Sequence, residues 1–399
     1  MYIAIIQCAY IFVLCTLFIK FVHDQLYNAR NYLIMAIHDP AIPYNILPKL
    51  PPKFDLETKR IMRKLADTRA ALAEMKGMGA IIPNQAMLIN TLTMREAKDS
   101  SEIENIVTTQ DELYIALAAQ LKNINPQIKE VLNYREALWS GYRLIKERGI
   151  LTSNDITKIQ QKIIENNAGI RTQPGTQLKN AASGEVIYTP PEGEDLIRKL
   201  LKNLEVYINL DDNGIDPLIK MAVIHYQFES IHPYYDGNGR TGRIINILYL
   251  VMKGLLDIPI LYLSSYIIKE KEDYYKLLSE IRYKNSWEDW IFYILNGIEE
   301  TANQTTILIR KIKVLLEETI EKVKTELPSV YSKDLVETIF EQPYCKVASI
   351  VEKGLFERRT AMKYLRELER IGILKAVPRG NQILFLNLRL YELLKQDSI

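Results

Sequence analysis

The sequence is long enough for two or three folded domains and carries almost no net charge. A length of 399 residues is too great for one small core. A hydrophobic fraction of 48% is too high for a disordered chain. Lysine and arginine number 51 against 49 aspartates and glutamates, a net charge of +2, so no whole-molecule field attracts nucleic acid or acidic lipid. The three cysteines, Cys8, Cys15 and Cys345, are odd in number and lack C-x-x-C spacing, which fits neither a disulfide framework nor a zinc site. A reducing, cytoplasmic compartment is expected.

Residues 1–43 begin with an apolar run. Residues 2–19 contain no charged side chain and, extended to Val22, are just long enough to span a bilayer as a helix. Lys20 and Arg30 follow the run and no lysine or arginine precedes it, so an anchor here would leave the rest of the chain in the cytoplasm. The alternatives are a buried helix and an upstream extension from a misassigned start codon. A tether to the membrane is therefore one of three interpretations of this segment.

The rest of the chain is expected to be mainly α-helical. Apolar residues recur at three- and four-residue spacing in residues 55–76, 111–121, 217–226 and 242–253. The proline-rich residues 42–54 cannot continue a helix, so they are expected to form an extended lead-in to the helix after Asp55. The fold class predicted by this pattern is mainly α.

Two segments depart from the helical pattern. Residues 176–191 contain two short extended stretches around an Ala-Ser-Gly turn, which predicts a β-hairpin. After Pro328, three short helices precede the alternating residues 375–388. This order predicts a winged helix-turn-helix that ends in a two-stranded wing.

Candidate catalytic residues gather in residues 232–243, HPYYDGNGRTGR. Gly237 and Gly239 flank Asn238 just before a strongly apolar helix, so the loop can turn sharply. Its backbone N–H groups can then converge beside the positive end of that helix. The spacing therefore predicts an anion cradle.

Charged side chains complete the motif. Arg240 and Arg243 are three residues apart on the first helical turn and can fork onto phosphate oxygens. Asp236 can hold a Mg²⁺ ion that bridges two phosphates. His232 supplies a proton acceptor whose ordinary pKa suits general-base work at neutral pH. A base, a metal ligand, an anion cradle and an arginine fork thus lie within one short segment.

These residues resemble the HPFx[D/E]GNGRxxR motif of the Fic family at every position except one, where Tyr234 replaces phenylalanine. The upstream QFESIHP and the downstream LYLSSYI also fit, and the expected hairpin is similar to the family's target-docking flap. The likeness runs from about Tyr44 to Gly297. It implies an all-α Fic core in which His232 deprotonates a target hydroxyl, that oxygen attacks the α-phosphorus of ATP, and Mg²⁺ on Asp236 stabilises the departing pyrophosphate.

The resemblance also assigns residues to the nucleotide. They are Asp236, Gly237, Asn238, Gly239, Arg240, Arg243, Tyr274 and Tyr275. The two arginines would clamp the β- and γ-phosphates, and the tyrosines would stack on adenine, although aromatic residues at helical spacing are equally often part of the core. His225 lies one turn from Phe228 on an apolar face and is expected to be a core histidine, not a catalytic one.

A second motif concerns regulation. Residues 100–105, SSEIEN, resemble the family's inhibitory [S/T]xxxE[G/N] helix, with Ser100 and Glu104 four residues apart on one helical face. The resemblance implies that Glu104 pairs with Arg243 and blocks productive binding of the γ-phosphate. The alternative is a solvated acidic helix in which Glu104 has no partner.

The C-terminal module keeps a different class of function open. Basic residues line its expected second helix and the tip of its wing: Arg358, Arg359, Lys363, Arg366, Arg370 and Arg379. DNA could dock there, but Glu357, Glu367 and Glu369 dilute the charge. Winged helices also serve as protein-binding or dimer contacts, so a homodimer is another possibility.

The expected function is that of a Fic-type protein adenylyltransferase, which uses ATP and Mg²⁺ to modify a tyrosine, serine or threonine hydroxyl of a target protein or of itself. The alternatives are removal of AMP from a modified protein, transfer of another phosphate-bearing group, and a DNA-binding regulator. The expected division of the chain is 1–43 apolar segment, 44–125 helical region with the inhibitory helix, 126–300 catalytic core, 301–330 linker helix and 331–399 winged helix-turn-helix.

Overall fold

The computed structural model describes residues 39–119, 124–180, 183–210 and 214–395. The interpretations of residues 2–22 as an anchor, a buried helix or an extension therefore lie outside the described residues. Within the described residues, no helix is both long and apolar enough to cross a bilayer.

Helices make up most of the described chain, as predicted. In chain order they are α2 (Lys59–Ala80), α3 (Ala86–Ile103), α4 (Gln110–Ala119), α5 (Pro126–Arg148), α6 (Ser153–Ile164), α7 (Glu194–Asn209), α8 (Pro217–Ile231), α9 (Asn238–Met252), α10 (Ser264–Lys269), α11 (Lys271–Lys284), α12 (Trp287–Glu326), α13 (Lys333–Thr338), α14 (Val347–Glu352), α15 (Arg358–Arg370) and α16 (Leu388–Lys395). The strands are β1 (Leu178–Lys179), β2 (Val186–Tyr188), β3 (Tyr344–Lys346), β4 (Leu374–Arg379) and β5 (Gln382–Asn387).

Local signals explain where α5 begins and ends. The side chain of Asn125 accepts a hydrogen bond from the backbone N–H of Gln127 at 2.9 Å, and Pro126 is the first helical residue. Both are favoured starts, because the cap satisfies a free N–H and proline lacks one. The helix stops at Gly149, which has a φ of 69°, a left-handed conformation that costs glycine little.

Helices α8 and α9 form the centre of the molecule. They pack against each other, with α5 and α6 on α9 and with α7 and α12 on α8. Nearly every residue of both helices is buried. The loop that joins them, residues 232–237, is therefore held between two rigid elements, and it is the loop that carries the candidate catalytic motif.

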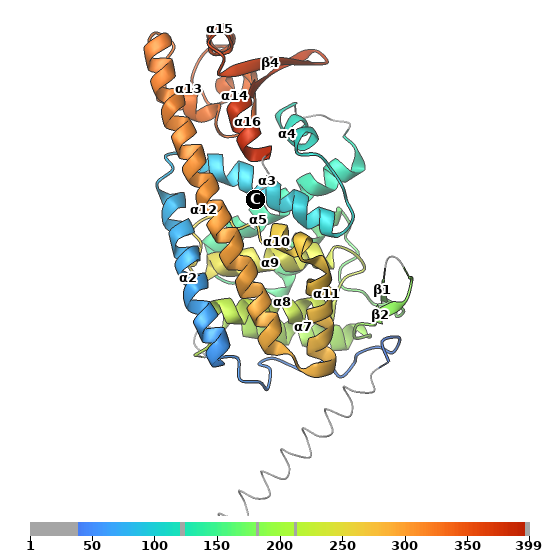
Figure 1. The fold of residues 1–399 in the computed structure, drawn as a ribbon. Coiled ribbons are helices and arrows are strands. Elements are labelled where there is room, and N and C mark those ends of the chain that lie inside the picture. The colour runs from blue at the N-terminus through green and yellow to red at the C-terminus, as the bar shows by residue number, and fades with distance from the viewer. Residues whose placement is uncertain (1–38, 120–123, 181–182, 211–213, 396–399) are drawn as a thin grey trace, which may run out of the picture.

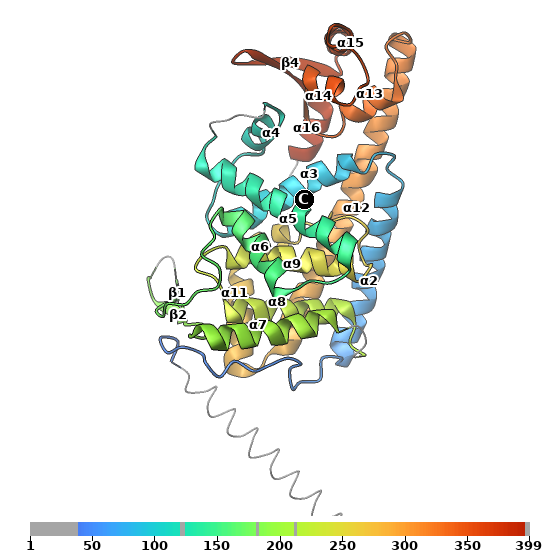
Figure 2. The same cartoon turned by 180° about the vertical axis from the view of Figure 1, so that it is seen from behind.

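Helix α12 packs on α8 and runs up to the C-terminal module, and α2 packs along the part of α12 that lies away from that module (Figures 1 and 2). Helix α12 spans 40 residues without a break. The division expected at residue 300 therefore falls inside one continuous helix.

The predicted hairpin is present as β1 and β2, on the side of the molecule away from α2 and α12 (Figure 1). The strands are antiparallel, with Leu178 opposite Tyr188 and Lys179 opposite Val186. Tyr188 holds the hairpin against the core, because its ring lies edge-on to Tyr44 with centroids 6.2 Å apart and its hydroxyl donates to the Ser230 carbonyl at 2.7 Å. The hairpin is thereby fixed next to the end of α8.

The C-terminal module has the three short helices and the two-stranded wing expected from the sequence, with one strand more than expected. Helices α13, α14 and α15 precede the antiparallel pair β4 and β5. The short strand β3 pairs with β5 on its other side and gives the order β3-β5-β4. Its three residues follow Pro343 and lead directly into α14, so the sequence offered no alternation long enough to predict a strand.

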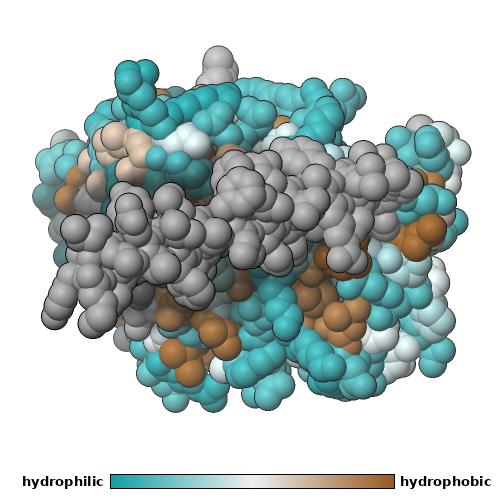
Figure 3. Space-filling model, turned by 90° about the horizontal axis from the view of Figure 1, so that it is seen from below, coloured by the Kyte–Doolittle hydropathy of each residue, from teal (hydrophilic) through white to brown (hydrophobic). Residues whose placement is uncertain are grey.

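Apolar side chains also reach the surface. The lead-in to α2 exposes Ile42 and Ile46, and the end of α7 exposes Val206 and Leu210. Seen from below, apolar patches lie among polar ones on the described surface (Figure 3). Scattered exposure of this kind is ordinary for a folded protein.

Candidate active site

The loop between α8 and α9 is shaped by two left-handed residues and one amide side chain. His232 ends α8 with a φ of 47°, and Gly237 precedes α9 with a φ of 77°. The Asn238 side chain accepts from the backbone N–H of Tyr234 at 2.9 Å and donates to its carbonyl at 2.8 Å. Because both ends of this amide bond to the backbone of Tyr234, Asn238 fixes the shape of the loop.

Two side chains of α6 support the loop from behind. The ring of Tyr234 is fully buried and its hydroxyl lies 2.9 Å from the Thr157 hydroxyl. The tyrosine that replaces phenylalanine in the motif thus has a polar partner, so its burial leaves no hydroxyl unsatisfied. Gln160 donates to the Asp236 carbonyl at 2.9 Å. Both supporting residues, Thr157 and Gln160, come from α6.

His232 is held through its backbone by a buried arginine. The Nε of Arg171 donates to the His232 carbonyl at 2.8 Å, and the Arg171 backbone N–H donates to the Pro233 carbonyl at 3.0 Å. Burial, helped by the positive charge of Arg171, lowers the pKa of His232 to about 4. The imidazole is therefore neutral at pH 7, which is the form that accepts a proton.

Arg243 reaches out of α9 to the end of α3. Its Nε donates to the Ser100 hydroxyl at 2.7 Å, and its Nη2 donates to the Ser100 carbonyl at 2.8 Å. The same Nη2 lies 2.8 Å from Oε1 of Glu104. Only 3% of the Arg243 side chain is exposed, whereas 35% of the Glu104 side chain is, so this ion pair is buried on the arginine side and reaches solvent on the glutamate side. The structure brings together the three residues that the inhibitory motif had linked.

The carboxylate of Glu104 also covers the glycine cradle. A Cβ atom built on Gly239 would stand 2.3 Å from Glu104 Oε1, so the carboxylate rests directly on this part of the loop. Burial works against its charged form, but the charge and hydrogen bond of Arg243 outweigh burial and lower the pKa of Glu104. The cradle is therefore covered by an anionic group of the chain itself.

Arg240 faces a different helix. Its Nη1 lies 2.8 Å from Glu130 Oε2 on α5, and its Nη2 lies 3.6 Å from Asp236 Oδ1. Each of the two guanidinium groups expected to clamp the phosphates is therefore held by a carboxylate from a different part of the chain, Arg240 by Glu130 and Arg243 by Glu104. The sequence spacing placed Arg240 and Arg243 on one helical turn, but it could not predict the carboxylates that pair with them.

Asp236 is the exposed charged residue of the motif. Its side chain is 72% exposed, and Oδ1 accepts from the backbone N–H of Gly237 at 2.6 Å. Among the described residues, no group of three or more histidine, cysteine, aspartate or glutamate side chains could hold a metal by itself. A single exposed carboxylate does fit Mg²⁺ that is bound mainly by substrate phosphates and water, since Mg²⁺ often takes only one or two protein carboxylates.

The two adjacent tyrosines occupy different environments. Tyr274 is 2% exposed and its hydroxyl lies 2.9 Å from His225 Nε2, so in this structure its ring belongs to the core and is not open to a ligand. His225 is fully buried and stacks on Trp290 with centroids 5.9 Å apart, as expected of a core histidine. Tyr275 is 40% exposed and is the ring that a nucleotide could reach.

Sequence reasoning missed other charged side chains next to the site. Arg171 and Glu130 lie outside the recognised motifs, and nothing in their local sequence indicates their partners. Glu229 lies three residues before His232, and its Oε1 is buried with no hydrogen-bond partner among the described residues. That oxygen would stand 2.3 Å from a Cβ at Gly242, and burial raises the pKa of Glu229 to about 7. Glycine at 242 thus leaves room for a carboxyl group beside the site.

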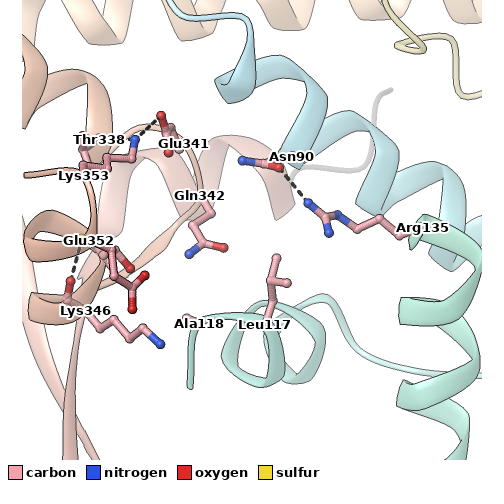
Figure 4. A pocket seen from close by; sticks show the side chains of 12 residues that line it. Asn90, Leu117, Ala118, Arg135, Thr338, Glu341, Gln342, Lys346, Glu352 and Lys353 are labelled. Atoms are coloured by element: carbon pink, nitrogen blue, oxygen red, sulfur yellow. Dashed lines mark hydrogen bonds and ion pairs between the residues drawn. The ribbon is translucent and has the colours of Figure 1, made fainter. Parts of the chain in front are cut away.

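A separate hollow lies where the C-terminal module meets the helical region. Its volume is about 330 Å³, and its wall comes from α3, α4, α5 and the winged helix. Asn90 accepts from Arg135 Nη2 at 2.7 Å on one side, and Lys353 lies 2.5 Å from Glu341 on the other (Figure 4). None of the residues predicted for the nucleotide site lines this hollow.

Two arginines of the winged helix form ion pairs with glutamates of the same helix. Arg366 lies 2.7 Å from Glu369, and Arg370 lies 2.9 Å from Glu367, all within α15. These pairs reduce the positive charge that the helix would offer to DNA.

Comparisons with known proteins match three parts of the chain. Residues 62–143 match the model of the Fic/DOC family N-terminal region, residues 150–250 match the Fic/DOC family itself, and residues 315–390 match the C-terminal domain of SoFic-like protein adenylyltransferases. The three segments follow each other in the order in which the structure places the helical region, the central loop and the winged helix.

Individual relatives are more distant. A protein adenylyltransferase Fic of Nematostella vectensis is 27% identical over 38% of this chain and 34% of its own length. A probable protein adenylyltransferase of Aquifex aeolicus (strain VF5) is 25% identical over 46% of this chain and 57% of its own length. This chain thus spans between about a third and somewhat over half of these relatives. A crystal structure of a Fic family protein from Desulfovibrio desulfuricans G20 aligns with a TM-score of 0.51 at 19% identity, over 84% of this chain and 98% of the other.

The helical core of the chain, in which a histidine, a glycine cradle and a buried arginine surround the start of α9, has the fold of Fic proteins. The chain belongs to the Fic/DOC family.

Proposed function

We propose that the chain is a protein adenylyltransferase that moves AMP from ATP to a hydroxyl side chain of a protein, and that Glu104 restrains it. The observation that carries this proposal is the arrangement around Gly239. A neutral histidine ends one helix, backbone N–H groups open the next, and the arginine beside them is held by a glutamate. The names of the Fic relatives, which are protein adenylyltransferases, support the same reaction.

In the proposed reaction His232 accepts the proton of the target hydroxyl. The freed oxygen bonds to the α-phosphorus of ATP while the bond from that phosphorus to the bridging oxygen of the β-phosphate breaks. AMP is then esterified to the target and pyrophosphate leaves. The positive end of α9 and the N–H groups from Gly237 to Gly239 stabilise negative charge on the phosphates. Arg243 pairs with the terminal phosphate once Glu104 has left it.

Asp236 is the residue proposed to hold Mg²⁺, which when bound offsets charge on the phosphates. Its exposed carboxylate can reach a metal that the nucleotide brings. Tyr275 is proposed to pack against the adenine ring, and the buried Tyr274 to support it from beneath, since their ring centroids are 5.1 Å apart. The exposed position of Tyr275 supports this division.

The target is proposed to bind along the β1–β2 hairpin. A two-stranded sheet leaves unpaired backbone groups along its outer edges, and an extended segment can add to such an edge as a further strand. The hairpin is fixed to the end of α8 through Tyr188 and Ser230, two residues before His232. A segment bound there is carried close to the proposed base.

Removal of AMP from a modified protein is the second candidate. What favours it is the position of Glu104, whose carboxylate covers the cradle next to Gly239 and could orient a water molecule there. A DNA-binding regulator gains no support from α15, where two of the basic residues are paired with glutamates of the same helix.

Mass spectrometry tests the proposal. The purified chain is incubated with ATP and Mg²⁺, alone and with a lysate, in the parent form and as Glu104→Gly. An added AMP on a tyrosine, serine or threonine, absent when His232 is replaced by alanine, is the expected result. If the Glu104→Gly protein adds no AMP to itself or to any lysate protein, while the parent removes AMP from a modified protein and Glu104→Gly does not, the second candidate replaces the first.

A further inference from the structure

Glu96 lies on the same face of α3 as the two residues of the inhibitory motif. Glu96, Ser100 and Glu104 follow each other at intervals of four, which places them along one side of a helix. The latter two contact Arg243. Glu96 is only 1% exposed, although a buried carboxylate is costly unless it has partners.

Three donors from two other elements meet this carboxylate. The Tyr134 hydroxyl, on α5, donates to Oε1 at 2.9 Å, and the Ser264 hydroxyl, at the start of α10, donates to the same oxygen at 2.6 Å. The backbone N–H of Ser264 donates to Oε2 at 3.1 Å. Both oxygens are therefore bonded, and Glu96 joins α3 to α5 and α10 in a place where water does not compete.

The end of α3 is held by the segment that follows α10. Lys271, the first residue of α11, donates from Nζ to the Ile103 carbonyl at 2.7 Å. This carbonyl belongs to the last helical residue before Glu104. Elements α10 and α11 thus hold α3 at Glu96 and again two turns later, next to the inhibitory carboxylate.

We propose that Glu96 is a positioning residue of the inhibitory switch, which fixes the rotation and the axial position of α3 so that Glu104 reaches Arg243. The inference rests on the proposed function, because it assigns a cause to the restraint proposed for Glu104. Eight residues of helix span about 12 Å, and a helix transmits a shift along its length as a rigid body. A slide or rotation of about 1 Å at Glu96 moves Glu104 by a similar amount, enough to lengthen a charged hydrogen bond beyond its useful range.

Removing single donor groups tests the proposal with little change in packing. Ser264→Ala removes one hydroxyl from the Glu96 carboxylate, Tyr134→Phe removes the other, and Glu96→Gln keeps the size of the side chain. Glu102→Gln is the matched control, because Glu102 lies on the same helix and bonds within it to Lys98 at 2.7 Å. Each substitution is made in the parent and in Glu104→Gly, and AMP incorporation and the affinity for ATP are measured for both sets, with thermal unfolding as a check of folding.

We expect Ser264→Ala, Tyr134→Phe and Glu96→Gln to raise incorporation in the parent by about two- to tenfold, the change that loss of one hydrogen bond produces, and the control to leave it unchanged. In Glu104→Gly the same substitutions should change nothing further, since Glu96 then has no inhibitory carboxylate to position. Equal effects in both backgrounds, or no rise in the parent by any folded variant, would overturn the role of Glu96. If Glu104→Gly itself fails to raise incorporation, the restraint by Glu104 is wrong and the inference is overturned with it.

Discussion

Glu104 Oε1 lies 2.8 Å from Nη2 of Arg243, an ion pair that joins the end of α3 to the second turn of α9. The two residues are 139 positions apart in sequence. Arg243 is buried, and the same guanidinium group also bonds the side chain and the carbonyl of Ser100. The guanidinium group of Arg243 lies beside Gly239 and is therefore already satisfied within the chain. An anionic ligand must displace Glu104 in order to bind it.

Replacing Glu104 by glycine should raise AMP incorporation about ten- to a hundredfold. A charged hydrogen bond contributes about 1.5–3 kcal/mol, and its loss frees both Arg243 and the space over Gly239. Incorporation of labelled AMP is measured for the variant, the parent and the control Glu102→Gly, which removes a glutamate from the same helix but not from Arg243. Parent-like incorporation by a folded Glu104→Gly protein would show that this carboxylate does not restrain the site.

His232→Ala in the Glu104→Gly background should reduce AMP transfer by about a hundred- to ten-thousandfold, which is the usual contribution of a general base. ATP affinity should change little, because the imidazole acts on the target hydroxyl. Transfer is followed by mass spectrometry and binding by calorimetry. Transfer within tenfold of the background protein would remove His232 from the mechanism.

The helical fold and the loop could be predicted because their signals are local. Periodicity gave the helices, and the spacing of Gly237, Asn238 and Gly239 predicted a turn into a helix. The pairing of Glu104 with Arg243 came from a family motif, and in the structure Arg243 contacts both Glu104 and Ser100. The helices and the turn were predicted from residues that are close together in sequence. Only the pair predicted from the family motif joins residues that are far apart.

Partners from distant elements could not be predicted. Glu130 is 110 residues from Arg240 and Arg171 is 61 residues from His232, and neither belongs to a periodic or spaced pattern. The burial of Tyr274 depends on the packing of His225 and Trp290 beneath it. Sequence spacing identifies which side chains share a face, but tertiary packing decides which of them remain open to a ligand.

Asp236→Ala should shift the Mg²⁺ dependence of transfer to higher concentration and lower the maximal rate. The reason is that Asp236 is the exposed carboxylate of the loop, whereas Glu130 is paired with Arg240. Magnesium titrations of transfer are compared in Glu104→Gly with and without the second change. Asp236→Asn, which keeps an oxygen ligand but loses the charge, should fall between the two. Superimposable titration curves would exclude Asp236 as the metal ligand.

A proline in place of Ile187 should impair modification of a target protein more than it impairs ATP binding. Ile187 is the central residue of β2 and is partly exposed, and proline removes a backbone N–H and disfavours strand pairing. Ile187→Thr, which suits a strand, is the control. Rates with the target and affinities for ATP are measured side by side, and an equal loss of both would indicate general misfolding instead of a docking defect.

The pH dependence of transfer in Glu104→Gly should lack the fall below neutrality that an ordinary histidine base produces. Burial and Arg171 lower the pKa of His232 to about 4, and the charge of Glu104 is one of the charges that raise it, so loss of that charge does not raise the pKa. The base form is lost only as the pH falls through that pKa. The rate should therefore change by less than about twofold between pH 8 and pH 6, and a tenfold loss per pH unit should begin only near pH 4. Glu229→Gln in the same background is the control for this pH profile. The pKa of Glu229 is raised to about 7, so its titration could otherwise shape the profile. A tenfold fall per unit that begins at pH 6.5 and persists in this control would mean that the imidazole is hydrated in the active state, and that its burial in this structure belongs to the restrained form.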